Sequence, residues 1–191
     1  MIPFAQRHLG LEVAAHVTSD AGARQAIDAG VSSLEHLGPL SRETLDLAAA
    51  RAVTLVPTLS VLEQMLLATE DEKKKDRTKR RIEAARAAFE RALASGIRIV
   101  CGTDIGVFPH AIGSRGELGL LVDYGMDELR ALRAATQDAA ALLGQHHLGR
   151  IAPGAVADLC VFPAPTDGRV AGAIAAHKPV LVIQGGRLRV T

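Results

Sequence analysis

Aromatic side chains are scarce in this sequence of 191 residues, at 3%, and tryptophan is missing altogether. Proteins that bind single-stranded nucleic acid stack its bases on exposed aromatic rings, so this composition argues against that class. Hydrophobic residues nevertheless make up 48% of the chain. The core must therefore be built from alanine, leucine, valine and isoleucine, as in parallel sheets covered by helices.

The sequence also lacks an excess of charge. Its formal net charge is +1, and the basic residues are not gathered in one motif. This balance gives no electrostatic reason to expect a nucleic acid or an anionic membrane as a partner. A small-molecule substrate or another protein chain is expected instead.

Signal peptides, long apolar runs and cysteine pairs are missing as well. No stretch of ~20 apolar residues occurs, and the two cysteines, Cys101 and Cys160, stand singly in strand-like runs. Such isolated thiols are typical of reducing compartments. We therefore expect a cytoplasmic protein.

What is present is an alternation of short apolar runs and helical segments, which predicts an α/β fold. We predict parallel strands over residues 11–17, 31–36, 54–59 and 97–104. We predict one helix that begins at Ser19 or Asp20 and a second that begins at Ser41. Three further helices are predicted over residues 70–95, 117–124 and 127–143. After residue 148 we predict only strands, at 157–162 and in a hairpin of 180–184 with 187–190. Residues 1–147 and 148–191 therefore form two predicted domains.

Three of the four predicted parallel strands lead to side chains that bind metals, namely His16, His36 and Asp104. In barrels and open α/β sheets, reactive groups collect at the C-terminal ends of the strands. Imidazole and carboxylate groups are ligands of zinc and similar ions, and catalytic sites leave one position open for water. The three residues together predict a metal site.

Several motifs follow one another in an order that resembles a known superfamily. They are His16-Val17, Ala-Gly-Val-Ser-Ser-Leu-Glu-His at 29–36, Val-Pro-Thr-Leu at 56–59, Gly-Thr-Asp at 102–104, Ala-Ala-Thr at 134–136, Leu-Leu-Gly at 142–144, Leu-Gly-Arg-Ile at 148–151, Pro-Gly at 153–154 and Ala-Asp-Leu at 157–159. The pattern resembles the metal-dependent amidohydrolase superfamily, especially its imidazolonepropionase-like and prolidase-like members. The resemblance implies a (β/α)₈ TIM-type barrel flanked by a small β-sandwich, and hydrolysis of amide, cyclic amide or peptide-like C–N bonds.

Roles for individual residues follow from the same resemblance. It implies that His16 and His36 are the metal ligands of barrel strands five and six, and that Asp104 is the acid of strand eight, which binds metal and transfers the proton. One or two divalent ions, most simply zinc, are implied. Such an ion lowers the pKa of bound water to about 7. His110 follows Asp104 in the next loop and is either a substrate contact or an exposed loop histidine.

Two parts of the superfamily's site are missing from the sequence, because it contains no His-x-His pair and no recognisable strand-four lysine. A complete barrel takes ~250 residues, whereas the β tail begins here near residue 148. The sequence therefore predicts about strands five to eight of a barrel followed by part of the sandwich. Such a half-barrel has unpartnered edge strands. It is a fragment of a longer enzyme, one subunit of a split enzyme, or a self-paired dimer.

A different class of function stays open, namely a non-catalytic half-barrel that binds or assembles. A nucleotide-binding domain is less well supported, because residues 102–106 have neither a dinucleotide fingerprint nor the lysine of a phosphate-binding loop. The predicted pocket loops, at 57–62 and 107–114, are mostly apolar. They favour an uncharged or apolar group next to the scissile bond.

Overall fold

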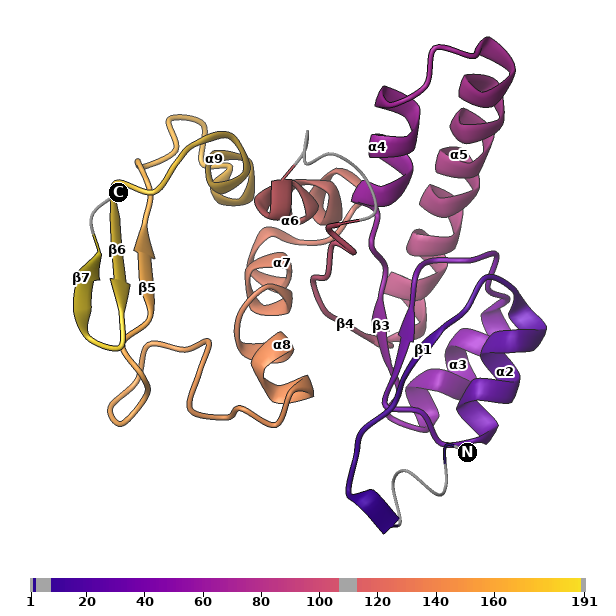
Figure 1. The fold of residues 1–191 in the computed structure, drawn as a ribbon, viewed down its shortest axis with the longest axis horizontal. Coiled ribbons are helices and arrows are strands. Elements are labelled where there is room, and N and C mark those ends of the chain that lie inside the picture. The colour runs from indigo at the N-terminus through magenta and orange to yellow at the C-terminus, as the bar shows by residue number, and fades with distance from the viewer. Residues whose placement is uncertain (1, 3–7, 107–112, 190–191) are drawn as a thin grey trace.

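The computed structural model describes residue 2 and residues 8–106 and 113–189. Four parallel strands form one sheet in sequence order: β1 (Ala14–His16), β2 (Ser33–Glu35), β3 (Thr54–Val56) and β4 (Arg98–Ile99). One row of paired residues, Ala15, Leu34, Leu55 and Ile99, crosses the whole sheet. The predicted parallel α/β arrangement is confirmed, and the C-terminal ends of all four strands lie along one edge of the sheet (Figure 1).

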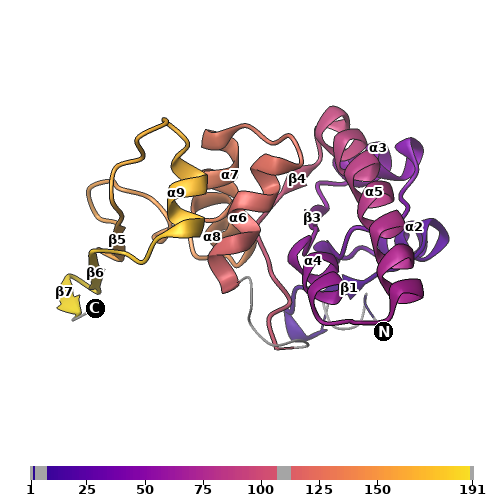
Figure 2. The ribbon, with the colours of Figure 1, turned by 90° about the horizontal axis from the view of Figure 1, so that it is seen from above.

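Three helices cover one side of this sheet, namely α2 (Asp20–Asp28), α3 (Arg42–Ala50) and α5 (Glu72–Ser95), as Figures 1 and 2 show. Ser19 and Ser41 cap α2 and α3 by accepting hydrogen bonds from backbone N–H groups, as predicted. The long helix α5 ends at Gly96, whose left-handed backbone (φ +76°) closes it. Its fully buried Phe89 packs in the core with Leu34 and Leu55 of the sheet.

The fourth strand is shorter than predicted, because the chain leaves the sheet after residue 100. The backbone N–H of Val100 still donates to the carbonyl of Leu55 in β3, whereas that of Cys101 donates to Ala134. Gly102 then passes so close to β3 that a Cβ atom there would lie 2.4 Å from a methyl carbon of Val56. Asp104 therefore lies in a loop beyond β4 and not at its last residue.

The helices differ from the prediction in two places. Residues 60–67 form a helix, α4 (Ser60–Leu67), that the sequence pattern did not indicate. The single helix predicted over residues 127–143 is two, α7 (Glu128–Ala134) and α8 (Gln137–Leu142). Thr136 breaks it with a non-helical backbone, and Gly149 packs on that break so tightly that a Cβ atom would lie 2.5 Å from the Thr136 carbonyl.

The C-terminal region forms a second, antiparallel sheet of β5 (Leu159–Val161), β6 (Leu181–Gln184) and β7 (Arg187–Arg189). The predicted hairpin is confirmed, and both turn glycines, Gly185 and Gly186, have positive φ. The prediction that this region contains only strands was wrong, because α9 (Val170–Ala176) packs on α6 (Gly113–Asp123) (Figure 2). Small residues allow this contact, since Gly119 of α6 faces the methyl group of Ala175. The domain boundary at 147 stays a prediction.

Among the residues that the structure describes, none of the helices is both long and apolar enough to span a membrane.

Candidate functional site

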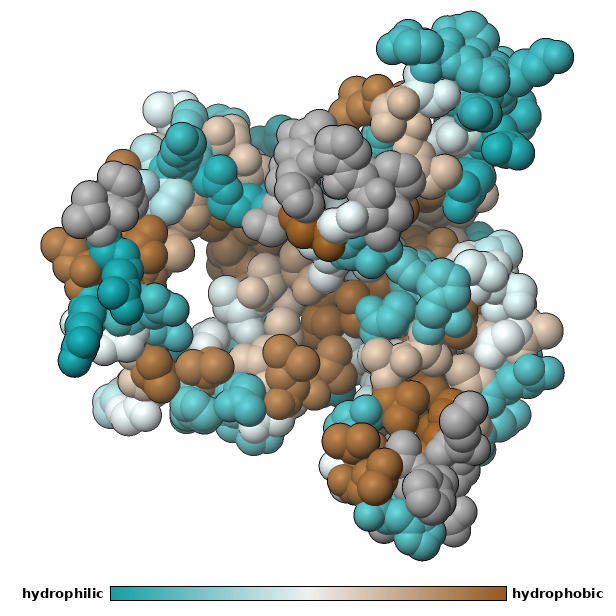
Figure 3. All heavy atoms as spheres, viewed as in Figure 1, coloured by the Kyte–Doolittle hydropathy of each residue, from teal (hydrophilic) through white to brown (hydrophobic). Residues whose placement is uncertain are grey.

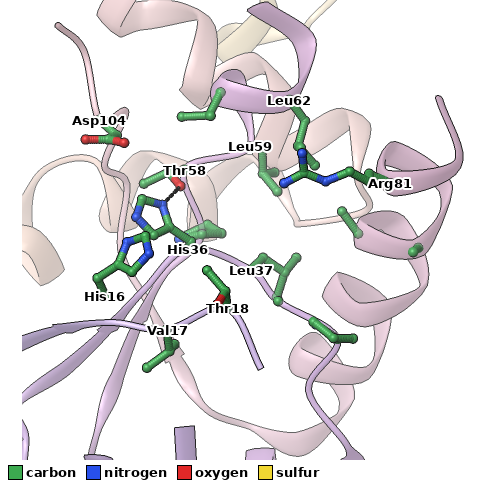
Figure 4. A pocket seen from close by; sticks show the side chains of 16 residues that line it. His16, Val17, Thr18, His36, Leu37, Thr58, Leu59, Leu62, Arg81 and Asp104 are labelled. Carbon is green, nitrogen blue, oxygen red and sulfur yellow. Dashed lines mark hydrogen bonds between the residues drawn. The ribbon is translucent and has the colours of Figure 1, made fainter. Parts of the chain in front are cut away.

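Two histidines lie side by side at the C-terminal edge of the parallel sheet. His16 ends β1, where it pairs with Glu35, and His36 directly follows β2. Their imidazole rings meet edge to face, with ring centres 4.5 Å apart and planes at 75° (Figure 4). The structure thus brings together two of the three residues singled out in the sequence.

His36 is fixed by a hydrogen bond from the next strand. Its Nδ1 lies 2.7 Å from the hydroxyl oxygen of Thr58, which follows β3 (Figure 4). When Nδ1 carries the proton it donates to this oxygen, and Nε2 is left with a free lone pair. Burial lowers the pKa of His36 below its usual value, and the nearby His16 lowers it further, against the opposing effects of Asp104 and Glu35. A neutral imidazole is the form that binds a metal.

Asp104 lines the same pocket and is exposed, and its carboxylate lies above the two rings in Figure 4. The donor types fit a divalent ion of the zinc kind, since two imidazoles are adjacent and one carboxylate faces their pocket. Within residues 8–106 and 113–189, however, no three His, Cys, Asp or Glu side chains are close enough to hold an ion together. A complete coordination shell needs further ligands or a movement of Asp104.

Backbone strain is concentrated at this site. Of the four non-glycine residues with positive φ in the described chain, three are His36 (+72°), Thr58 (+49°) and Asp104 (+49°). Each such residue costs on the order of 1–3 kcal/mol and persists only where its surroundings hold it. Strain of this kind gathers at active sites and ligand clamps, and nothing in the residue types would have revealed it.

His16, His36 and Asp104 line one cavity of about 410 Å³, which lies between the strand ends, α4 and α5. Its walls are mainly apolar, and they include much of the predicted 57–62 loop: Pro57, Thr58, Leu59, Val61 and Leu62. The other predicted pocket loop falls largely outside the described residues, and so does the predicted substrate contact His110.

A cation that the sequence did not single out also lines the cavity. Arg81 of α5 extends its guanidinium toward Leu59 and Leu62 (Figure 4). Only the sulfur of Met65 accepts from it, at 3.8 Å, and it forms no ion pair with another described residue. Arg81 stands in a run of mixed charge typical of a solvated helix face, so no sequence signal set it apart.

A second missed residue lies behind the cavity. Glu117 of α6 is completely buried, and its two carboxylate oxygens accept hydrogen bonds from the backbone N–H groups of Leu59 (2.7 Å) and Ser60 (2.8 Å). Burial raises the pKa of Glu117 to about 6, although both N–H donors act in the opposite direction. Leucines and glycines surround Glu117 in the sequence, and nothing in that pattern predicts a hydrogen bond to residues 59 and 60.

Comparison with known proteins places this chain in a family. A model of the amidohydrolase family matches residues 3–188. The chain belongs to the amidohydrolase family. This amidohydrolase is 33% identical over 138 residues to ochratoxinase of Aspergillus niger, an alignment that covers 69% of this chain and 28% of ochratoxinase.

Several solved structures are similar to this chain over nearly its whole length. A Xaa-Pro dipeptidase with bound methionine superposes with a TM-score of 0.83 at 29% identity, covering 97% of this chain and 46% of that one. A prolidase-like protein from Bifidobacterium longum gives a TM-score of 0.78 at 29% identity, covering 95% of this chain and 47% of that one. The A. niger ochratoxinase structure gives 0.75 at 28% identity, covering 93% and 41%. The chain thus spans less than half the length of each of these relatives.

Proposed function

We propose that this chain carries part of the active site of a metal-dependent hydrolase that cleaves amide, cyclic amide or peptide-like C–N bonds. The observation that carries the proposal is the His16–His36 pair at adjacent strand ends, facing a pocket that Asp104 shares. Family membership supports the reaction class, and dipeptidase, prolidase and ochratoxinase are the names of similar proteins.

In this proposal His16 and His36 would hold a divalent ion, most simply zinc, through their imidazole nitrogens, and Asp104 would contribute its carboxylate. When bound, the ion supplies an activated water and polarises the scissile carbonyl. Asp104 accepts the proton that the water loses and returns it to the leaving nitrogen, so that it acts as a base and then as an acid. Its exposed position in the loop after β4 leaves the carboxylate free for both transfers.

We further propose that the remaining ligands lie outside the described residues, on the other half of a barrel. The four parallel strands with helices on one side correspond to half of a (β/α)₈ closure, and the solved relatives are about twice as long as the matched part. The second half is the rest of a longer chain, a separate subunit or a second copy. The second, antiparallel sheet is the corresponding part of the β-sandwich.

Zinc titration and hydrolysis of dipeptides, N-acyl amino acids and cyclic amides test the proposed function. We expect His16→Ala or His36→Ala to weaken zinc binding at least tenfold, because each removes a ligand. Asp104→Asn should cut hydrolysis by a factor on the order of 10²–10⁴, because it removes the proton acceptor. His177→Ala, outside the pocket, is the control.

Zinc binding that survives both histidine changes would contradict the metal site. Zinc binding without hydrolysis, even after mixing with a complementary half, would favour the alternative, a half-barrel that binds or assembles without catalysis.

The lining of the pocket also supports a more specific proposal about the substrate. Leu59, Leu62 and the prolines of the cavity fit an apolar group next to the scissile bond, and Arg81 is a cation without a carboxylate partner among the described residues. We infer that the substrate carries a carboxylate. The structure of a related prolidase was solved with N-methylphosphonate-L-proline, a ligand with both features.

Arg81→Met should raise KM about tenfold for N-acyl amino acids and leave kcat nearly unchanged, because it removes an ionic contact made by substrate and transition state alike. C-terminally amidated versions of the same substrates provide the comparison. If Arg81→Met has equal effects on the acids and the amides, Arg81 does not bind a carboxylate.

A further inference from the structure

The buried carboxylate of Glu117 supplies an acceptor that helix α4 lacks. The residue at the N-cap position of α4, Leu59, has no side-chain oxygen to accept from the first backbone N–H groups. Glu117 reaches this position from α6 and accepts from Leu59 and Ser60, one N–H group on each carboxylate oxygen. Bonds of this kind, with a charged acceptor, are short and strong in a buried setting.

This contact holds the turn that carries Thr58. Thr58 immediately precedes the two clamped N–H groups, is 5% exposed and has a φ of +49°. A β-branched residue is rarely found in this conformation, so neighbouring contacts must impose it. The hydroxyl of Thr58 in turn lies 2.7 Å from Nδ1 of His36.

A second connection leads from the same turn toward Asp104. The hydroxyl of Ser60, whose N–H is bound to Glu117, donates to the carbonyl oxygen of Thr103 at 3.3 Å. Thr103 directly precedes Asp104, which also has a left-handed backbone. One buried carboxylate therefore anchors a turn that contacts both His36 and the residue before Asp104.

We propose that Glu117 is a positioning residue for His36: by fixing the turn at Thr58 it keeps the Thr58 hydroxyl against Nδ1 and directs Nε2 into the pocket. The consequence for metal binding rests on the proposed function, whereas the coupling of Glu117 to the imidazole does not. A carboxylate that only stabilised the fold would leave the protonation pattern of the imidazole ring unchanged.

The test compares Glu117→Gln with Glu128→Gln in the full chain without metal. Glu128 is a matched control, because its carboxylate also accepts a backbone N–H, from Ala171 at 2.6 Å, but away from the pocket. The ¹⁵N signals of the His36 ring, identified by their loss in His36→Asn, report which nitrogen carries the proton. Thermal unfolding reports the loss of stability in each variant.

In Glu117→Gln one of the two N–H groups loses its acceptor, because an amide offers a single oxygen. We expect His36 to change from one dominant tautomer to a mixture, as in Thr58→Val. The double variant, Glu117→Gln with Thr58→Val, should show no further change in the His36 signals, because both substitutions break the same chain of contacts. Glu128→Gln should leave the His36 signals unchanged, although it also removes a carboxylate that accepts a backbone N–H. Zinc affinity should fall about 10–100-fold in Glu117→Gln only.

Unchanged His36 signals in Glu117→Gln, or an equal change in Glu128→Gln, would overturn the proposal. If Glu117→Gln does not fold, Glu117→Asp replaces it, since the shorter carboxylate withdraws from both N–H groups and the same outcomes apply. A chain that shows the tautomer change but neither binds zinc nor hydrolyses amides would refute the proposed function and leave the positioning role intact.

Discussion

The position and hydrogen bonding of the His36 ring depend on residues that lie far from it in the sequence. His16 touches its ring, Thr58 bonds its Nδ1, and Glu117 holds Thr58 in place. His16, His36 and Asp104 could be found in the sequence because each lies at or soon after the end of a recognisable strand. Thr58 and Glu117 could not, because a backbone with positive φ and a buried contact across 58 residues leave no periodic signal.

The buried carboxylate makes stability depend on pH with a definite sign. The pKa of Glu117 rises from 4.5 to about 6 on folding, so the folded chain binds more protons than the unfolded chain in this range. Its contribution is therefore fully present below pH 4.5 and is lost as pH rises through 6, by about 2 kcal/mol. Cys101 and Tyr124 nearby do not interfere, because their pKa values are raised to about 12.

Urea unfolding of the wild type and of Glu117→Gln between pH 4.5 and 7.5 measures this contribution. The difference in free energy of unfolding between the two should shrink by about 2 kcal/mol as pH rises. Both proteins also carry His36→Asn for this comparison, because the lowered pKa of His36 acts with the opposite sign. A difference that is flat with pH would show that Glu117 has an ordinary pKa in the folded chain.

At the scale of elements, the sequence predicts several helix ends and one hairpin turn, because each depends on one or two local residues. Ser19 and Ser41 as N-caps, Gly96 as a C-terminal stop and Gly185-Gly186 as a hairpin turn each act through their own backbone or side chain. They were predictable for that reason.

The helices that were missed depend on contacts between distant segments. The first turn of α4 is capped from α6, and α9 is an alanine-rich segment that packs on Gly119. The break at Thr136 is covered by Gly149, thirteen positions further along the chain. No local window of sequence contains both partners of such a contact.

At the scale of the whole molecule, the parallel sheet has a second surface, opposite the helices α2, α3 and α5. Val56, Val100, Leu142 and Leu143 line a shallow cavity on this surface together with the ends of β1 and β2. Figure 3 shows apolar side chains gathered over α7 and α8 and between these helices and the strands. We call this surface the inner face. Leu143, which lines the cavity on the inner face, is 73% exposed, as expected of a half-barrel without its other half.

If the inner face is an assembly surface, the purified chain should exceed its monomer mass of 20.1 kDa. Light scattering checks this prediction. Leu143→Glu should return the mass to that of a monomer, because it places a charge on an apolar interface. Leu129 is a matched control, since it is 71% exposed, close to the 73% of Leu143, and does not line the cavity. A wild-type chain that stays monomeric without bound zinc would rule out the self-paired dimer and leave completion by another chain or a longer one.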